Sequence, residues 1–161
     1  MMGQVLAAAA GTIAFSVLFS VPRAYYPYCG IIGGVGWIVY SLLLPGASSP
    51  EATFFATVAV IVLSRFFAVW ERCPVTLFLI PGIFPLVPGA GVYWTAYYIV
   101  MDDLELASET GFTALKVAVA IVLGIVFIFQ LPQGIFASVA ALVPNRWRRG
   151  QIKERRGGKK I

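Results

Sequence analysis

The sequence lacks histidine altogether, and charged residues make up only 12% of its 161 positions. Without histidine the chain has no imidazole for a metal site or a proton relay. Soluble domains carry about 25% charged residues, whereas this chain is 60% hydrophobic and its mean hydropathy is +0.87. These values exclude a water-soluble domain and predict an integral membrane protein.

Sequence patterns for catalysis are also missing. The chain contains no nucleotide-binding loop, no catalytic triad and no CxxC pair, because its two cysteines, Cys29 and Cys73, are far apart. We therefore expect no enzymatic activity, no cofactor and no metal. The apolar runs contain no acid in their interior, although proton-coupled transport needs a titratable group in the membrane. A partner, or an acid at the outer edge such as Glu51, Asp102 or Asp103, would have to supply it.

Long apolar runs are what the chain does have. A membrane-spanning helix needs about 20 apolar residues, and five runs approach or exceed this length, at residues 2–21, 28–44, 52–69, 75–101 and 112–143. The last run is too long for one crossing, so Pro132 and Gly134 are expected to end or kink it. Residues 135–143 would then form a short helix at the membrane surface. The predicted fold is all-α, with a five-span domain over residues 1–145.

The basic residues predict the orientation of these spans. Eight of the twelve Lys and Arg residues follow Pro144. Basic segments next to membrane spans stay in the cytoplasm and bind anionic lipids. Residues 146–161 are therefore expected to form a cytoplasmic tail on the lipid surface, and no nucleic-acid partner is expected. The first positive charge, Arg23, follows the first run, so five spans with the N-terminus outside and the C-terminus inside satisfy the pattern.

Arg65 is the only charged residue within the third apolar run. It lies about one turn from the inner end of that run. In one interpretation its side chain snorkels to the membrane surface. In the other it faces the bundle interior and is available to an anionic substrate or a carboxylate partner.

The fourth run is interrupted by the strongest helix breakers in the chain. Residues 81–94 read PGIFPLVPGAGVYW, with three prolines and three glycines within residues 81–91. Lipid cannot satisfy the backbone groups that proline frees, so protein must cover this stretch or it must line a wet cavity.

We interpret the run as a discontinuous helix with halves at 75–80 and 91–101, whose second half points free N–H groups at a substrate carboxylate. A proline-kinked helix without a ligand is the alternative. The candidate residues for the substrate pathway are Pro81, Gly82, Pro85, Pro88, Gly89, Gly91, Tyr93 and Thr95, together with Arg65.

The segment PLVPGAGVY, preceded by Pro81-Gly82, resembles the signature of the threonine/serine exporter (ThrE) family. Over nearly its whole length the chain is similar to the small, YjjB-like subunit of the split form of that family. This resemblance implies a secondary transporter of the cell inner membrane that exports threonine, serine or related small carboxylates. It also implies a larger, YjjP-like complementary subunit as partner. The motif positions that carry over are Pro81, Gly82, Pro85, Pro88, Gly89 and Tyr93.

An odd number of spans has a further consequence. Two five-span units joined in series would have opposite orientations, which is the inverted-repeat plan of many secondary transporters. A single unit would be half a transporter, completed by a partner or by a second copy in a homo-oligomer. The alternative function is a non-transporting membrane scaffold that stabilises the larger subunit.

Overall fold

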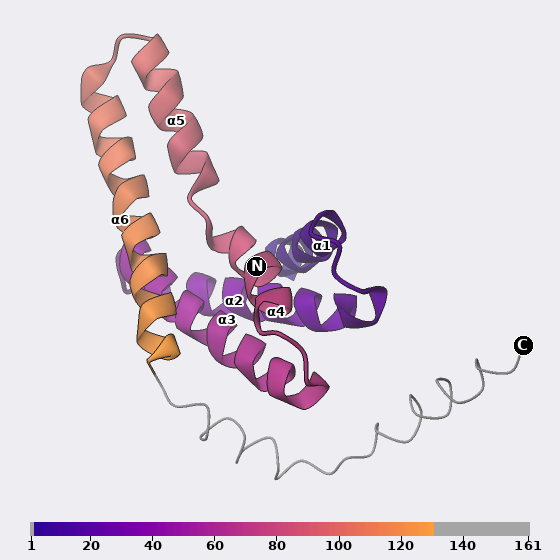
Figure 1. Ribbon diagram of the computed structural model, residues 1–161. Helices are drawn as coiled ribbons and strands as arrows, with labels where there is room; N and C mark the ends of the chain where they lie inside the picture. The colour runs from indigo at the N-terminus through magenta and orange to yellow at the C-terminus, as the bar shows by residue number, and fades with distance from the viewer. Residues whose placement is uncertain (1, 131–161) are drawn as a thin grey trace, which may run out of the picture.

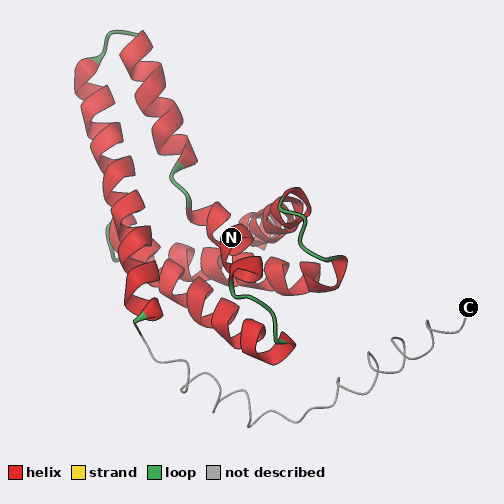
Figure 2. Ribbon diagram, in the orientation of Figure 1, coloured by secondary structure: helices red, strands yellow, loops and turns green. Residues whose placement is uncertain are grey.

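The computed structural model describes residues 2–130, and every regular element within them is a helix (Figure 2). The predicted end of the last span at Pro132 and Gly134, the surface helix at 135–143 and the tail at 146–161 lie outside the described residues. In chain order the elements are α1 (Met2–Leu18), η1 (Arg23–Tyr25), α2 (Tyr26–Leu43), α3 (Ser49–Glu71), α4 (Thr76–Ile83), η2 (Phe84–Leu86), α5 (Gly89–Val100) and α6 (Leu104–Phe129).

Several of these helices have the length and apolar composition of membrane spans. Three pass both criteria, over Arg23–Leu43, Ser49–Glu71 and Leu104–Phe129, and the bent pair Thr76–Leu86 and Gly89–Val100 passes as a fourth. Helix α1 is apolar but shorter. The chain is therefore a membrane protein that is all-helical over residues 2–130, and five spans with the predicted orientation stay a prediction.

The last described helix begins earlier than the hydropathy pattern predicts. Helix α6 starts at Leu104 rather than at residue 112, because the Asp103 carboxylate accepts a hydrogen bond from the Leu106 N–H (3.2 Å) and caps the first turn. Helix α3 likewise starts at Ser49 rather than 52, where the Glu51 side chain accepts a hydrogen bond from the Ser48 N–H (2.9 Å). Glu105 and Glu109 lie between the fourth and fifth apolar runs, where the hydropathy pattern predicts an outer connecting segment. As a correction, the structure places both in α6.

Helix α2 lies at the centre of the packing. It contacts α1 on one side and α3 on the other, and α4 packs against both α2 and α3. Four glycines of α2 are buried, which lets its neighbours approach closely. A Cβ atom at Gly36, for example, would lie 2.6 Å from Val60 Cγ2 of α3. The fully buried core side chains nearby include Ile32, Ile61 and Phe78.

Helices α5 and α6 form a hairpin that extends away from the group formed by α1 to α4 (Figure 1). Helix α6 packs against α5 and also against α3, whereas α5 has no buried residue of its own. The connection between α4 and α5 is therefore the point at which the chain leaves the core.

Candidate functional site at the helix break

The interruption in the fourth run is a bend between two helices rather than a gap in one. Helix α4 and the following turn η2 meet α5 at an angle of 46°. Pro81 lies inside α4, Pro85 lies in η2, and Pro88 immediately precedes α5. The first half therefore continues to Ile83 instead of ending at residue 80, and the second begins at Gly89 instead of 91. Proline at or just before the first turn of a helix removes no hydrogen bond of that helix. This explains why Pro85 can lie at the start of η2 and Pro88 just before α5.

The chain itself pairs the carbonyl groups that the prolines free. Pro81 has no N–H for the Leu77 carbonyl four residues earlier, and the Cys29 thiol of α2 donates to that carbonyl instead (S···O 3.8 Å). The Pro81 carbonyl accepts from the Phe84 N–H, and the Phe84 carbonyl accepts from the Val87 N–H (3.2 Å). Tight turns and one thiol thus replace the hydrogen bonds of a continuous helix.

The amide groups at the start of α5 are different. The first N–H groups of a helix have no acceptor within it, and Pro88 provides no side-chain cap. The Gly89 N–H donates to the Val87 carbonyl (2.7 Å). Ala90 and Gly91 come next, and both line a cavity. The positive end of the α5 dipole therefore faces this cavity and favours a negatively charged group there.

The cavity has a volume of about 460 Å³ and lies between the break and three other helices. Cavities that bind small molecules typically measure about 300–1,000 Å³. It is lined by Trp37 and Tyr40 of α2, Ser49 and Thr53 of α3, Pro85 to Pro88 at the break, Ala90, Gly91 and Trp94 of α5, and Glu109, Thr110, Thr113, Ala114 and Val117 of α6.

Polar groups from three helices line this cavity. The Tyr40 and Ser49 hydroxyls lie 3.3 Å apart, and the Thr53 hydroxyl donates to the Ser49 carbonyl (2.8 Å). The Trp37 Nε1 atom is buried and has no acceptor within residues 2–130. A buried donor without an acceptor is costly. Protein atoms cover the Nε1 atom, so a ligand would reach it only if the side chains around it moved.

The structure brings three of the candidate pathway residues to the cavity, namely Pro85, Pro88 and Gly91. Two more, Pro81 and Gly82, are buried where α4 packs on its neighbours, and a Cβ atom at Gly82 would lie 2.7 Å from Ile32 Cγ2. These two positions shape the helix packing and do not line the cavity.

The remaining candidates lie elsewhere. Gly89 and Tyr93 are exposed outside the cavity lining, and Tyr93 is 63% exposed. The Thr95 hydroxyl lies between α5 and α6, 2.7 Å from the Gly91 carbonyl and 3.2 Å from the Thr110 hydroxyl. Arg65 is buried on α3, with its guanidinium 4.9 Å from the centre of the Phe129 ring. A role for these residues in transport stays a prediction.

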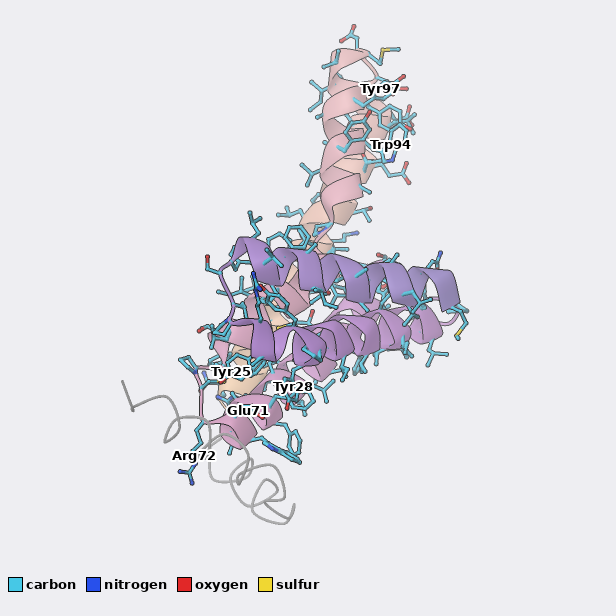
Figure 3. The ribbon with its side chains drawn as sticks, turned by 90° about the vertical axis from the view of Figure 1, so that its right-hand side faces the viewer. Tyr25, Tyr28, Glu71, Arg72, Trp94 and Tyr97 are labelled. Carbon is cyan, nitrogen blue, oxygen red and sulfur yellow. The ribbon has the colours of Figure 1, made fainter. Side chains whose placement is uncertain are left out.

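Two groups of aromatic residues lie at opposite ends of the molecule (Figure 3). Trp94 and Tyr97 lie on the α5 hairpin with their rings 5.6 Å apart. At the other end, the Tyr28 hydroxyl donates to the Glu71 carboxylate (3.1 Å) close to Arg72 and Tyr25. Aromatic residues favour the two surfaces of a membrane. The cavity, which Trp94 lines, thus lies toward the hairpin end.

Comparison with known families gives a match over most of the chain. Residues 4–130 match the model of a family described as Threonine/Serine exporter, ThrE. The matched segment covers well over half of the chain and includes every residue that lines the cavity. This family is one of transporters. No solved structure matches the chain.

Proposed function

Because the chain belongs to the threonine/serine exporter family, we propose that it is a subunit of a secondary transporter that exports threonine, serine or a related small carboxylate. One observation carries this proposal. The break between α4 and α5, from Pro85 to Gly91, lines a cavity of about 460 Å³ together with hydroxyl groups from α2, α3 and α6. Broken helices with polar surroundings are the usual substrate sites of secondary transporters.

The groups in the cavity fit the chemistry of such a substrate. Its carboxylate is stabilised at the start of α5, where the Ala90 and Gly91 amides lie at the positive end of the helix dipole. Its hydroxyl group has partners in Ser49 and Thr113. The apolar walls at the prolines contact the other faces of the substrate.

The proposal includes a partner and a location. The chain would reside in the cell inner membrane with five spans, the N-terminus outside and the basic tail of 146–161 in the cytoplasm. A larger, YjjP-like subunit would complete the transporter. The exposure of α5 supports this arrangement, because no residue of that helix is buried within the described chain and the cavity is open beside it.

The test fills the cavity without disturbing the core. Ala90 and Ala96 are both exposed on α5, but only Ala90 lines the cavity. Cells that express the full chain with its larger subunit are loaded with labelled threonine, serine or succinate, and efflux is measured. We expect A90L to slow efflux strongly and A96L to leave it unchanged at equal membrane levels. Equal efflux from A90L and the unmodified chain would place the pathway elsewhere.

The scaffold function is favoured by a different observation. The Leu77, Pro81 and Phe84 carbonyls are already paired within the chain, so the bend is stable without a ligand. If the scaffold function holds, the larger subunit exports on its own once an unrelated membrane helix stabilises it. The transporter function requires that efflux stops when this chain is absent, even with the larger subunit at full level.

A further inference from the structure

The side chains that line the cavity carry one formal charge. Among the described lining residues, Glu109 is acidic and none is Lys or Arg. Within residues 2–130, no hydrogen bond or ion pair engages the Glu109 carboxylate. Glu109 is also exposed. Within the described part of the chain, the cavity therefore combines an unpaired carboxylate with the N–H groups at the start of α5.

The register of the hairpin gives the spacing of these two features. A Cβ atom at Gly91 would lie 3.1 Å from Ala114 Cβ, and the Thr95 and Thr110 hydroxyls are 3.2 Å apart. Gly91 is thus level with Ala114. Glu109 lies five residues before Ala114, so at 1.5 Å per residue it is about 7.5 Å along the helix axis from the level of Gly91.

We propose that Glu109 determines substrate specificity by binding the ammonium group of an α-amino acid whose carboxylate lies at the start of α5. This inference rests on the proposed export function and selects among its substrates. A small zwitterion covers a separation of this size with a hydrogen bond at each end. The Ser49 and Thr113 hydroxyls, which line the cavity, then contact the remaining oxygen atoms.

The same arrangement disfavours a dicarboxylate. With one carboxylate at the α5 amides, the second carboxylate of succinate would lie toward Glu109, and the described lining offers no basic side chain to neutralise either charge. Specificity arises from such repulsion as much as from attraction. The cavity is therefore built for a substrate with one negative and one positive charge.

The experiment compares E109Q with E105Q in cells that express the full chain together with its larger subunit. Glutamine keeps the shape and a hydrogen-bonding oxygen but removes the charge. Glu105 is one turn earlier on α6, is exposed and does not line the cavity, so E105Q is the matched control. The probes are labelled threonine, its amine-free analogue 2,3-dihydroxybutyrate, and succinate. A third variant, E109D, keeps the charge.

We expect E109Q to lower the efflux of threonine relative to dihydroxybutyrate about tenfold to a hundredfold, the range for one hydrogen bond to a charged group. Succinate efflux should rise relative to threonine. E105Q should behave as the unmodified chain, and E109D should recover part of the preference.

A misfolded E109Q variant would lose efflux of all probes equally, and E109D then decides the question. Aspartate keeps the charge but moves it by one methylene group, so a lower preference of E109D for threonine over dihydroxybutyrate supports the inference. If E109Q and E109D both leave the ratio of threonine to dihydroxybutyrate efflux unchanged, the inference is wrong while export itself stands. If the unmodified chain exports none of the three probes, the proposed function and this inference fail together.

Discussion

Gly82 allows the packing role of the family motif to be separated from a role in binding. A Cβ atom at this position would lie 2.7 Å from Ile32 Cγ2 and 3.2 Å from Val60 Cγ1. Favourable carbon contacts lie at about 3.5–4.0 Å, and both neighbours are completely buried and cannot move aside. Overpacking of this kind costs about 1–3 kcal/mol. G82A should therefore destabilise the contact of α4 with α2 and α3.

Gly89 is the matched control, because a Cβ atom there would meet nothing within 4 Å. Alanine favours helix over glycine by about 1 kcal/mol at interior positions, so G89A should be neutral or slightly stabilising. The assay is thermal unfolding of the purified chain in detergent, in which 1 kcal/mol corresponds to about 2–4 °C for a protein of this size. Equal melting temperatures for G82A and G89A would refute the packing argument.

Three further predictions concern the stability and orientation of the described helices. C29A removes the thiol that donates to the Leu77 carbonyl and should lower the free energy of unfolding by about 1 kcal/mol. C29S keeps a donor and should lose less stability. Equal free energies of unfolding for C29A and C29S would contradict this hydrogen bond. D103A removes the cap of α6 and should lower the free energy of unfolding by about 0.5–2 kcal/mol. D103N should retain most of the stability, because asparagine is also a good capping residue. Equal instability of D103N and D103A would count against the cap. The predicted orientation places Gly46 outside and Ala24 inside. In a chain with Cys73 replaced by serine, G46C should therefore react with a membrane-impermeant maleimide in intact cells, and A24C only after permeabilisation. The reverse labelling would show the opposite orientation.

The elements that local patterns specify were predicted well from the sequence. The break at residues 81–94 follows from its prolines, and the helices follow from the apolar runs. Capping residues were the signal that hydropathy alone missed. The S-x-x-E pattern from Ser48 to Glu51 marks a helix start, and Asp103 followed by Glu105 marks another. The second of these pairs places Glu109 inside a helix from local sequence alone.

The walls of the cavity could not be predicted in this way. Trp37 and Thr53 reach the break from segments far away in the chain, and no local pattern records which distant helices meet. Thr95 shows that the direction of a side chain is equally hard to predict from local sequence. Its hydroxyl suggested a substrate contact, yet it lies between α5 and α6, 2.7 Å from the Gly91 carbonyl. A hydroxyl in a helix often bonds to the carbonyl four residues earlier, so its presence near a motif says little about its direction.

The clustered prolines therefore have a geometric consequence rather than a direct chemical one. If they served to expose carbonyl groups to a substrate, those groups would lack partners, but Leu77, Pro81 and Phe84 all have donors within the chain. What the prolines do produce is the 46° bend, which carries α5 away from the core and leaves the Ala90 and Gly91 amides beside an open cavity. Binding is then expected to depend on those amides and on side chains from other helices. Substitution of Pro81 should therefore change efflux by changing the bend. Substitution of Glu109 should change the preference among substrates by removing the charge.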